Sequence, residues 1–203
     1  YRNKSPPPEL VETTNDKIGS SCYSELWLYK LLMDLTRFVS ENKQGQDVDQ
    51  TIEEGLCNLW DITVDRELIK DLKQFDLVQI FTKVLIENQF PRLTEILFGI
   101  LANLANDGEM CREISESEEL TWIILGSLND RDIPVLNETC RVIHTVIASE
   151  EHRTNWTHKI HFQENVHDNL IFILHSSLNI GLLKNSLHLT EALITEDDSL
   201  AEI

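Results

Sequence analysis

The chain of 203 residues is long enough for one sizeable core or a short solenoid, and its 41% apolar and 26% charged residues are ordinary for a folded protein. No apolar run approaches the length of a transmembrane helix, so we expect no membrane partner. The net charge of −18 argues against direct binding of nucleic acid, and it fits either a basic protein partner or a surface that is simply well solvated.

The first 17 residues predict a disordered or extended arm, because a run of three prolines is followed by polar residues. Residues 18–203 predict one helical repeat domain. Its opening part, residues 18–63, is expected to form helices at 22–40 and 51–63 that cap the stack, as a solenoid requires at its ends. The apolar face of the first helix is expected to contain Leu26, Trp27, Tyr29, Leu31, Leu32, Leu35, Phe38 and Val39.

Three units of three helices are predicted to follow, at 65–106, 108–149 and 150–195. Their lengths lie within the roughly 40–47 residues of armadillo and HEAT repeats. Pro91, at the start of one third helix, recurs as Pro134 in the next unit. No segment alternates with period two for long enough to argue a strand, so the expected class is all-α, an armadillo-like α-solenoid. The helices expected in these units are 65–72, 75–88, 91–106, 109–115, 118–129, 133–148, 150–160, 165–176 and 179–195.

The strongest helix signal is the segment 91–106, whose apolar residues follow the spacing of a wide buried face. Pro91 suits its first turn. We expect the Asn-Asp-Gly run to end this helix, with Gly108 at positive φ. Asp65 and the Ser-Glu-Ser-Glu run at 115–118 are expected to cap the helices that follow them.

Catalytic and metal-binding motifs are absent from the sequence. It contains no phosphate-binding glycine loop, no nucleophile elbow and no zinc-protease motif, so we expect no enzyme activity and no cofactor. His152, His158, His161 and His167 crowd one region, but no cysteine lies near them and their spacing is unlike a structural zinc site. We therefore expect no metal. The four cysteines lie far apart and predict reduced thiols, as in the cytosol or nucleus.

A binding surface is the remaining expectation, since the third helices of a right-handed stack line its concave side. Asn103, in Leu-Ala-Asn-Leu-Ala, resembles the peptide-clamping asparagine of armadillo proteins such as importin alpha and beta-catenin, and Asn58 is its counterpart in the cap. The next unit has Val146 where Asn103 would recur, so a regular asparagine ladder is absent. Asn103 is therefore either a residue that clamps a bound peptide or a polar residue that is hydrogen-bonded within its own layer of the helical stack. Further groove candidates are Arg92, Arg141, His144 and Thr145.

Three ordered blocks resemble the serum amyloid A-like 1 family. They are Ile-Gly-Ser-Ser-Cys-Tyr-Ser-Glu-Leu-Trp-Leu at 18–28, Leu-Trp-Asp-Ile-Thr-Val-Asp at 59–65, and the Pro-Arg-Leu to Gly-Ile-Leu-Ala-Asn helix at 91–103. The resemblance implies an armadillo-like fold, a nuclear or nucleocytoplasmic location, no catalysis and a loose link to cell proliferation. It transfers no binding residues.

Two functions therefore remain open. The first is a non-catalytic scaffold or adaptor that binds a basic or extended protein segment on its concave third-helix face. The second is a regulatory subunit that docks on a larger complex through an end or convex surface, such as the region of Trp27 and Tyr29. These two aromatic residues also suit the first packed layer without any partner. The oligomeric state is not indicated by the sequence.

Overall fold

The computed structural model describes residues 17–41, 47–163 and 165–200. Every regular element in these ranges is a helix, apart from one isolated antiparallel bridge between Lys17 and Ser24. The predicted all-α class is confirmed. The chain divides into two compact units, residues 1–89 and 90–203. The predicted N-terminal arm lies outside the described residues except for Lys17.

The first unit holds four α-helices, and the starts of α2 and α3 are fixed by aspartate caps. Asp49 Oδ1 accepts hydrogen bonds from the N–H groups of Thr51 and Ile52, and Asp65 Oδ1 accepts one from Glu67 N. These bonds satisfy backbone donors that have no partner inside the helix, so the predicted cap at Asp65 is confirmed. The helices are α1 (Glu25–Glu41), α2 (Gln50–Ile62), α3 (Arg66–Leu72) and α4 (Leu77–Glu87), with a short 3₁₀ turn at Lys73–Phe75.

The apolar face predicted for α1 is wrong in part. Leu26 and Tyr29 are exposed, whereas Leu28, which was not assigned to that face, is fully buried. The helix begins at Glu25 rather than at residue 22, and its buried stripe follows helical spacing from Leu28. Leu26 and Tyr29 lie outside that stripe. The buried residues of α1 are Leu28, Leu31, Leu32, Leu35 and Val39.

The second unit holds the remaining helices, one of them capped at the predicted place. Ser117 Oγ accepts from Leu120 N, which confirms the serine cap. The expectation of positive φ at Gly108 is wrong, because Gly108 is the first residue of its helix and Asp107 in extended conformation is its cap. The helices are α5 (Pro91–Leu104), α6 (Gly108–Glu116), α7 (Glu118–Gly126), α8 (Ile133–Ile147), α9 (Glu150–Phe162), α10 (Val166–Ser176) and α11 (Ile180–Leu200), with a 3₁₀ turn at Ser127–Asn129.

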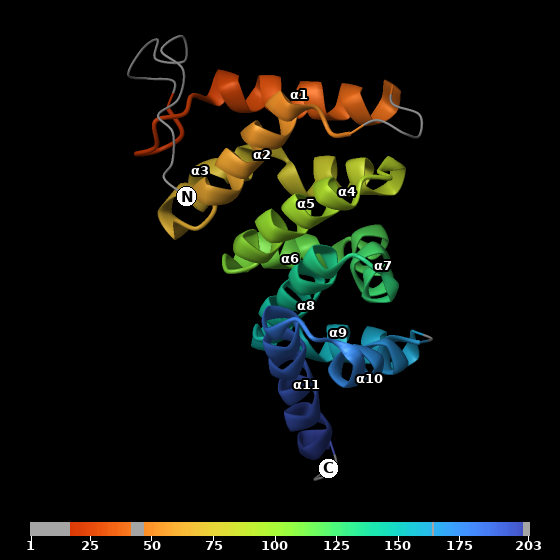
Figure 1. Cartoon of the computed structure of the whole chain (residues 1–203). Helices are drawn as coiled ribbons and strands as arrows, with labels where there is room; N and C mark the ends of the chain where they lie inside the picture. The colour runs from red at the N-terminus through yellow and green to blue at the C-terminus, as the bar shows by residue number, and fades with distance from the viewer. Residues whose placement is uncertain (1–16, 42–46, 164, 201–203) are drawn as a thin grey trace. The chain divides into compact units, whose positions relative to one another are not determined.

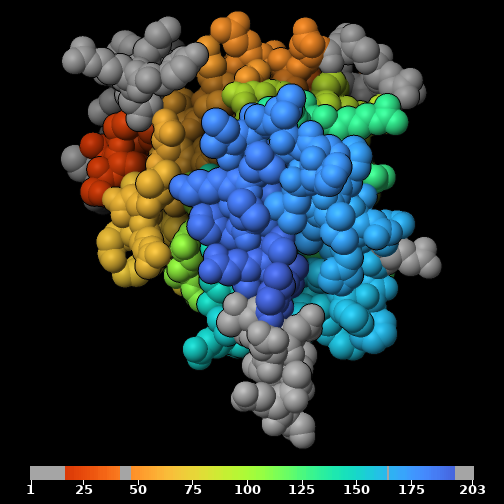
Figure 2. Space-filling model, turned by 60° about the horizontal axis from the view of Figure 1, so that its bottom comes forward, coloured from red at the N-terminus to blue at the C-terminus, as the bar shows by residue number. Residues whose placement is uncertain are grey.

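The core of the second unit is organised by α5 and α8. Figure 1 shows α8 packed between α5 and α11, and the most extensive helix contacts of the unit are those of α8 with α5 and with α11. Leu101 in α5 and Val142 in α8 are fully buried. Trp156 of α9 is also fully buried, and its indole Nε1 donates to Ser115 Oγ at 3.0 Å. Figure 2 shows α11 at the surface beside α10.

Candidate functional site

The helices α5, α8 and α11 present a strip of polar side chains that we call the third-helix face: Asn103, Asn137, Arg141, His144, Thr145, Asn185 and His188. Arg141, at the middle of α8, is its centre. Its Nη2 donates to the backbone carbonyl of Gly99 at 2.6 Å and to Asn103 Oδ1 at 3.1 Å, both on α5. The guanidinium group therefore ties two neighbouring helices together.

Glu138 completes the arrangement one helical turn before Arg141. Its Oε2 lies 3.1 Å from Arg141 Nε, and only 9% of the side chain is exposed. Burial raises the pKa of the Glu138 carboxyl above its ordinary value, although the charge of Arg141 and a hydrogen bond from Asn137 act in the opposite direction. Because removal from water costs an ion more than it costs a neutral acid, Arg141 is needed to keep this carboxylate charged in its place.

The polar contacts continue from α8 to α11. Asn137 Nδ2 donates to Glu138 Oε1 at 3.1 Å, and Asn185 Nδ2 of α11 donates to Asn137 Oδ1 at 3.0 Å. Side-chain amides can donate and accept at the same time, so they extend such a network across a helix boundary. One connected series of polar contacts therefore runs from α5 through α8 to α11.

His144 and Thr145 lie one turn further along α8. The His144 ring is 5.9 Å from the His188 ring of α11, centroid to centroid. Burial lowers the pKa of His144 below its ordinary value of 6.5; His188 lowers it further and Glu191 raises it. Thr145 Oγ1 donates to Arg141 O at 2.8 Å. At neutral pH this end of the face therefore presents a neutral imidazole and a hydroxyl that is bonded to its own helix.

The predicted site residues fall into three groups. Asn103, Arg141, His144 and Thr145 lie together on α5 and α8, as expected for a third-helix surface. Arg92 is at the other end of α5, where its Nη1 lies 2.7 Å from Glu95 Oε2. The other three predicted residues belong to the first unit. They are Asn58 in α2 and Trp27 and Tyr29 in α1.

Three members of the third-helix face were missed by sequence reasoning: Asn137, Asn185 and His188. A usable signal existed for the two asparagines, since each interrupts the apolar pattern of a third helix. Asn103 Oδ1 accepts a hydrogen bond from Arg141 of the next third helix, a contact that neither of the two readings of this residue anticipated. Such a contact depends on how α5 and α8 pack, and helical periodicity does not report it.

The aromatic residues of α1 make contacts inside the first unit. The ring centroid of Trp27 is 4.4 Å from that of Tyr23, and the centroid of Tyr29 is 4.9 Å from that of Phe75. These are ordinary aromatic pair distances, and they agree with the interpretation of both residues as part of a packed layer. Half of the Tyr29 side chain nevertheless remains exposed.

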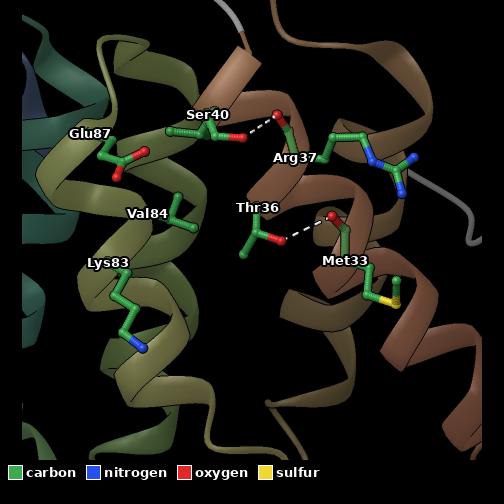
Figure 3. Close-up of a pocket in the computed structure, with 8 residues that line it drawn as sticks. Met33, Thr36, Arg37, Ser40, Lys83, Val84 and Glu87 are labelled. Carbon is green, nitrogen blue, oxygen red and sulfur yellow. Dashed lines mark hydrogen bonds between the residues drawn. The ribbon is translucent and has the colours of Figure 1, made fainter.

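An open groove of about 500 Å³ lies between α1 and α4 of the first unit (Figure 3). Met33 and Val84 contribute apolar surface, and Lys83 and Glu87 contribute opposite charges. The hydroxyls of Thr36 and Ser40 donate hydrogen bonds to the backbone carbonyls of Met33 and Arg37 on their own helix. The groove is therefore an apolar strip with a charged rim. Its lining residues are Met33, Thr36, Arg37, Val39, Ser40, Lys83, Val84 and Glu87.

Among the histidines considered as metal ligands, His161 and His167 lie close together, with their ring centroids 5.8 Å apart. His152 is buried on α9, while His158 and His161 are exposed and lie beside Phe162. Among the residues that the structure describes, no three His, Cys, Asp or Glu side chains gather closely enough to hold a metal ion. Within the same ranges, no helix combines the length and the apolar character needed to cross a bilayer.

Comparison with curated proteins places the chain among known relatives. It is 36% identical over 208 residues to Protein saal1 of Danio rerio, an alignment that covers 98% of this chain and 44% of that protein. The chain is homologous to the SAAL1 proteins. Protein SAAL1 of Homo sapiens is 33% identical over 194 residues, covering 91% of this chain and 41% of its own length. The resemblance to the serum amyloid A-like 1 family is thus confirmed, and the chain spans less than half the length of these relatives.

The fold is that of armadillo repeat proteins. A designed armadillo repeat protein in complex with the peptide (KR)4 superposes with a TM-score of 0.59 at 20% identity, covering 80% of this chain and 64% of that one. A crystal structure of an engineered protein gives a TM-score of 0.62 at 15% identity, with 80% and 63% coverage. At these identities the likeness shows the fold alone, an all-α solenoid. No family model matches the chain.

Proposed function

We propose that this protein is a non-catalytic scaffold that binds an extended, positively charged protein segment along its third-helix face. The observation that carries the proposal is the connected polar series from Asn103 through Arg141 and Asn137 to Asn185, which crosses three consecutive third helices. A continuous row of side-chain amides, linked through Arg141 and Glu138, suits the backbone of an extended peptide, whose N–H and C=O groups repeat at regular intervals.

The positive charge of the proposed partner follows from the protein as a whole rather than from this face alone. Arg92 lies against Glu95 and Arg141 against Glu138, so the acids of α5 and α8 are already balanced locally. The net charge of −18 creates a long-range field that attracts a cationic segment and fades at high salt. The designed armadillo repeat protein in complex with (KR)4 supports a basic peptide as the first ligand to test.

Location and cellular role belong to the same proposal. We place the protein in the nucleus, and also in the cytoplasm, with a link to cell proliferation, by analogy with the family that it resembles. A fluorescent fusion that stayed outside both compartments would contradict this part.

The direct test is a fluorescence anisotropy titration of labelled (KR)4 with the purified protein. Asn103→Ala should weaken binding about tenfold, the equivalent of roughly 1.4 kcal/mol, because a half-buried amide of the face is removed. Asn58→Ala is the matched control, since it removes a half-buried asparagine from α2 in the other unit. Binding should also weaken as salt rises. Equal effects of the two substitutions, or affinity that is independent of salt, would refute the proposed face.

A second function is favoured by the groove between α1 and α4. Its exposed Met33 and its open apolar strip fit the docking of an apolar segment from a larger complex, as a regulatory subunit would dock. This binding should survive high salt and should be lost on Met33→Lys. A partner that is retained by the Met33→Lys variant and released by salt would exclude this second function and favour the third-helix face.

A further inference from the structure

A small pit lies on the second unit, between α7 and α9. It has a volume of about 140 Å³, and its lining combines the buried Thr121 and Leu125 with the exposed Trp122 and Phe162. Trp122 is 58% exposed and Phe162 is 70% exposed. The His158 ring also lines the pit and lies 4.3 Å from that of Phe162, centroid to centroid. Single exposed apolar residues are normal on a surface, but two large aromatic side chains beside one hollow are a feature of a binding site.

The volume of the pit limits what it can hold. Pockets for small-molecule ligands measure roughly 300–1,000 Å³, so a pit of about 140 Å³ is too small for most substrates and cofactors. An apolar cavity of roughly 150 Å³ holds one benzene molecule. The pit therefore matches a single side chain of the size of phenylalanine or leucine, presented by a protein segment.

An ion pair connects the two helices at one edge of the pit. Lys159 Nζ of α9 lies 3.0 Å from Glu118 Oε1 of α7, and it also donates to Ser115 O at 3.5 Å. The Lys159 side chain is 16% exposed, whereas that of Glu118 is 68% exposed. Lys159 therefore lines the pit with its aliphatic stem while its charge is balanced by the pair. Because the pair ties α7 to α9, the pit is formed in the free protein.

The charge around the pit is negative. Glu119 is exposed and lies one helical turn before Trp122 on α7. Glu116, at the end of α6, is exposed as well. Within the part of the chain that the structure describes, neither of these two carboxylates forms an ion pair. Since Glu118 and Lys159 balance each other, the excess charge beside the pit complements a cation of the partner.

We propose that the pit anchors a short segment of another protein, in which a phenylalanine or leucine inserts beside Trp122 and Phe162 and an adjacent lysine or arginine faces Glu119. The apolar side chain supplies affinity, because anchors buried in small desolvated pockets dominate the binding energy of protein interfaces. The neighbouring cation supplies selection against acidic segments. A purely cationic peptide such as (KR)4 has no side chain for the pit, so this site is independent of the proposed binding along the third-helix face.

Fluorine NMR of protein labelled with 5-fluorotryptophan tests the pit directly. The probe is the peptide Gly-Ser-Phe-Lys-Lys-Ser-Gly, and the resonance of Trp122 is assigned with the variant Trp122→Phe. Titration should shift this resonance and leave that of the fully buried Trp156 unchanged. A peptide with alanine in place of phenylalanine should bind about tenfold more weakly. The absence of a Trp122 shift up to millimolar peptide would overturn the proposal.

Two phenylalanines separate the pit from the rest of the surface. Phe162→Ala should weaken binding of the peptide about tenfold while the helical circular dichroism stays unchanged, because the side chain is exposed in the free chain. Phe172→Ala is the matched control, since Phe172 is 68% exposed on α10 and does not line the pit. It should leave peptide binding as it is. Equal weakening by the two substitutions would overturn the site.

Charge and occupant are tested in the same titration. A peptide with both lysines replaced by glutamate should bind severalfold more weakly than the original, and Glu119→Lys should reverse this order. Equal affinity of the two peptides would overturn the adjacent cation. A Trp122 shift that (KR)4 alone reproduces would overturn the apolar anchor. A Trp122 resonance that moves with protein concentration in the absence of peptide would make a second copy the occupant and overturn the segment of another protein.

Discussion

Replacing Arg141 with alanine should destabilise the second unit well beyond the effect of an ordinary surface substitution. The side chain donates to Gly99 O and Asn103 Oδ1 on α5, and it lies 3.1 Å from Glu138 Oε2. Its removal leaves the Glu138 carboxylate, 9% exposed, without its cation. Breaking a fully buried pair costs about 3–5 kcal/mol, but a third of Arg141 is exposed, so we expect about 2–3 kcal/mol.

The cost can be measured by urea unfolding in which hydrogen-exchange mass spectrometry of peptides from α5 and α8 is the probe. These peptides report the free energy of unfolding of the second unit apart from that of the first. Arg92→Ala is the matched control, since Arg92 also pairs with a glutamate three residues away on a third helix but is 44% exposed. It should cost less than about 1 kcal/mol. Adding Glu138→Gln to Arg141→Ala should recover part of the loss. A change below about 0.5 kcal/mol for Arg141→Ala alone would refute the role of Arg141 as the tie between α5 and α8.

Three further tests probe the core, the thiols and the titration of His144. Leu101→Asp places an unpartnered carboxylate at a fully buried site, which costs several kcal/mol out of a total stability of ~5–15 kcal/mol. Circular dichroism should therefore show that the second unit is unfolded. A melting curve like that of the wild type would contradict the assignment of Leu101 to the buried face of α5. In native protein at pH 8, iodoacetamide should label the exposed Cys22 first. Cys140 should react only after unfolding, because it is buried and burial raises its pKa to about 12. Equal labelling of the two cysteines, measured by mass spectrometry, would contradict this. Because the pKa of His144 is lowered in the folded protein, its contribution to stability is present above pH 6.5 and is lost as pH falls through the lowered value. The free energy of unfolding measured in urea should therefore fall between pH 7 and 5, and His144→Gln should make that fall smaller. An equal dependence on pH in the two proteins would contradict this.

Much of the fold could be read from the chain because helical periodicity and caps are local signals. Pro91 at the start of α5, Asp65 before α3 and Ser117 before α7 all lie where the sequence placed them. Gly108 was read wrongly because a glycine between two helices suits either the end of one or the start of the next. Asp107 decides the matter by capping α6.

The candidate site was only partly predictable, since it depends on contacts between helices. The third helices and the group around Asn103 and Arg141 follow from the repeat pattern. The bond from Arg141 to Asn103 requires that two residues far apart in sequence meet across α5 and α8. The contact of Asn185 with Asn137 likewise depends on how α11 packs on α8. A single sequence encodes these pairings only through packing, which no local pattern describes.

Photo-crosslinking locates the binding surface most directly. A (KR)4 peptide that carries a photoreactive group would be irradiated with the protein, and the modified residues mapped by mass spectrometry. Binding along the third-helix face predicts crosslinks on α5, α8 and α11, near Asn103, His144 and His188, that disappear with excess unlabelled peptide. Competed crosslinks confined to α1 and α4 would contradict this face and favour the groove beside Met33 instead.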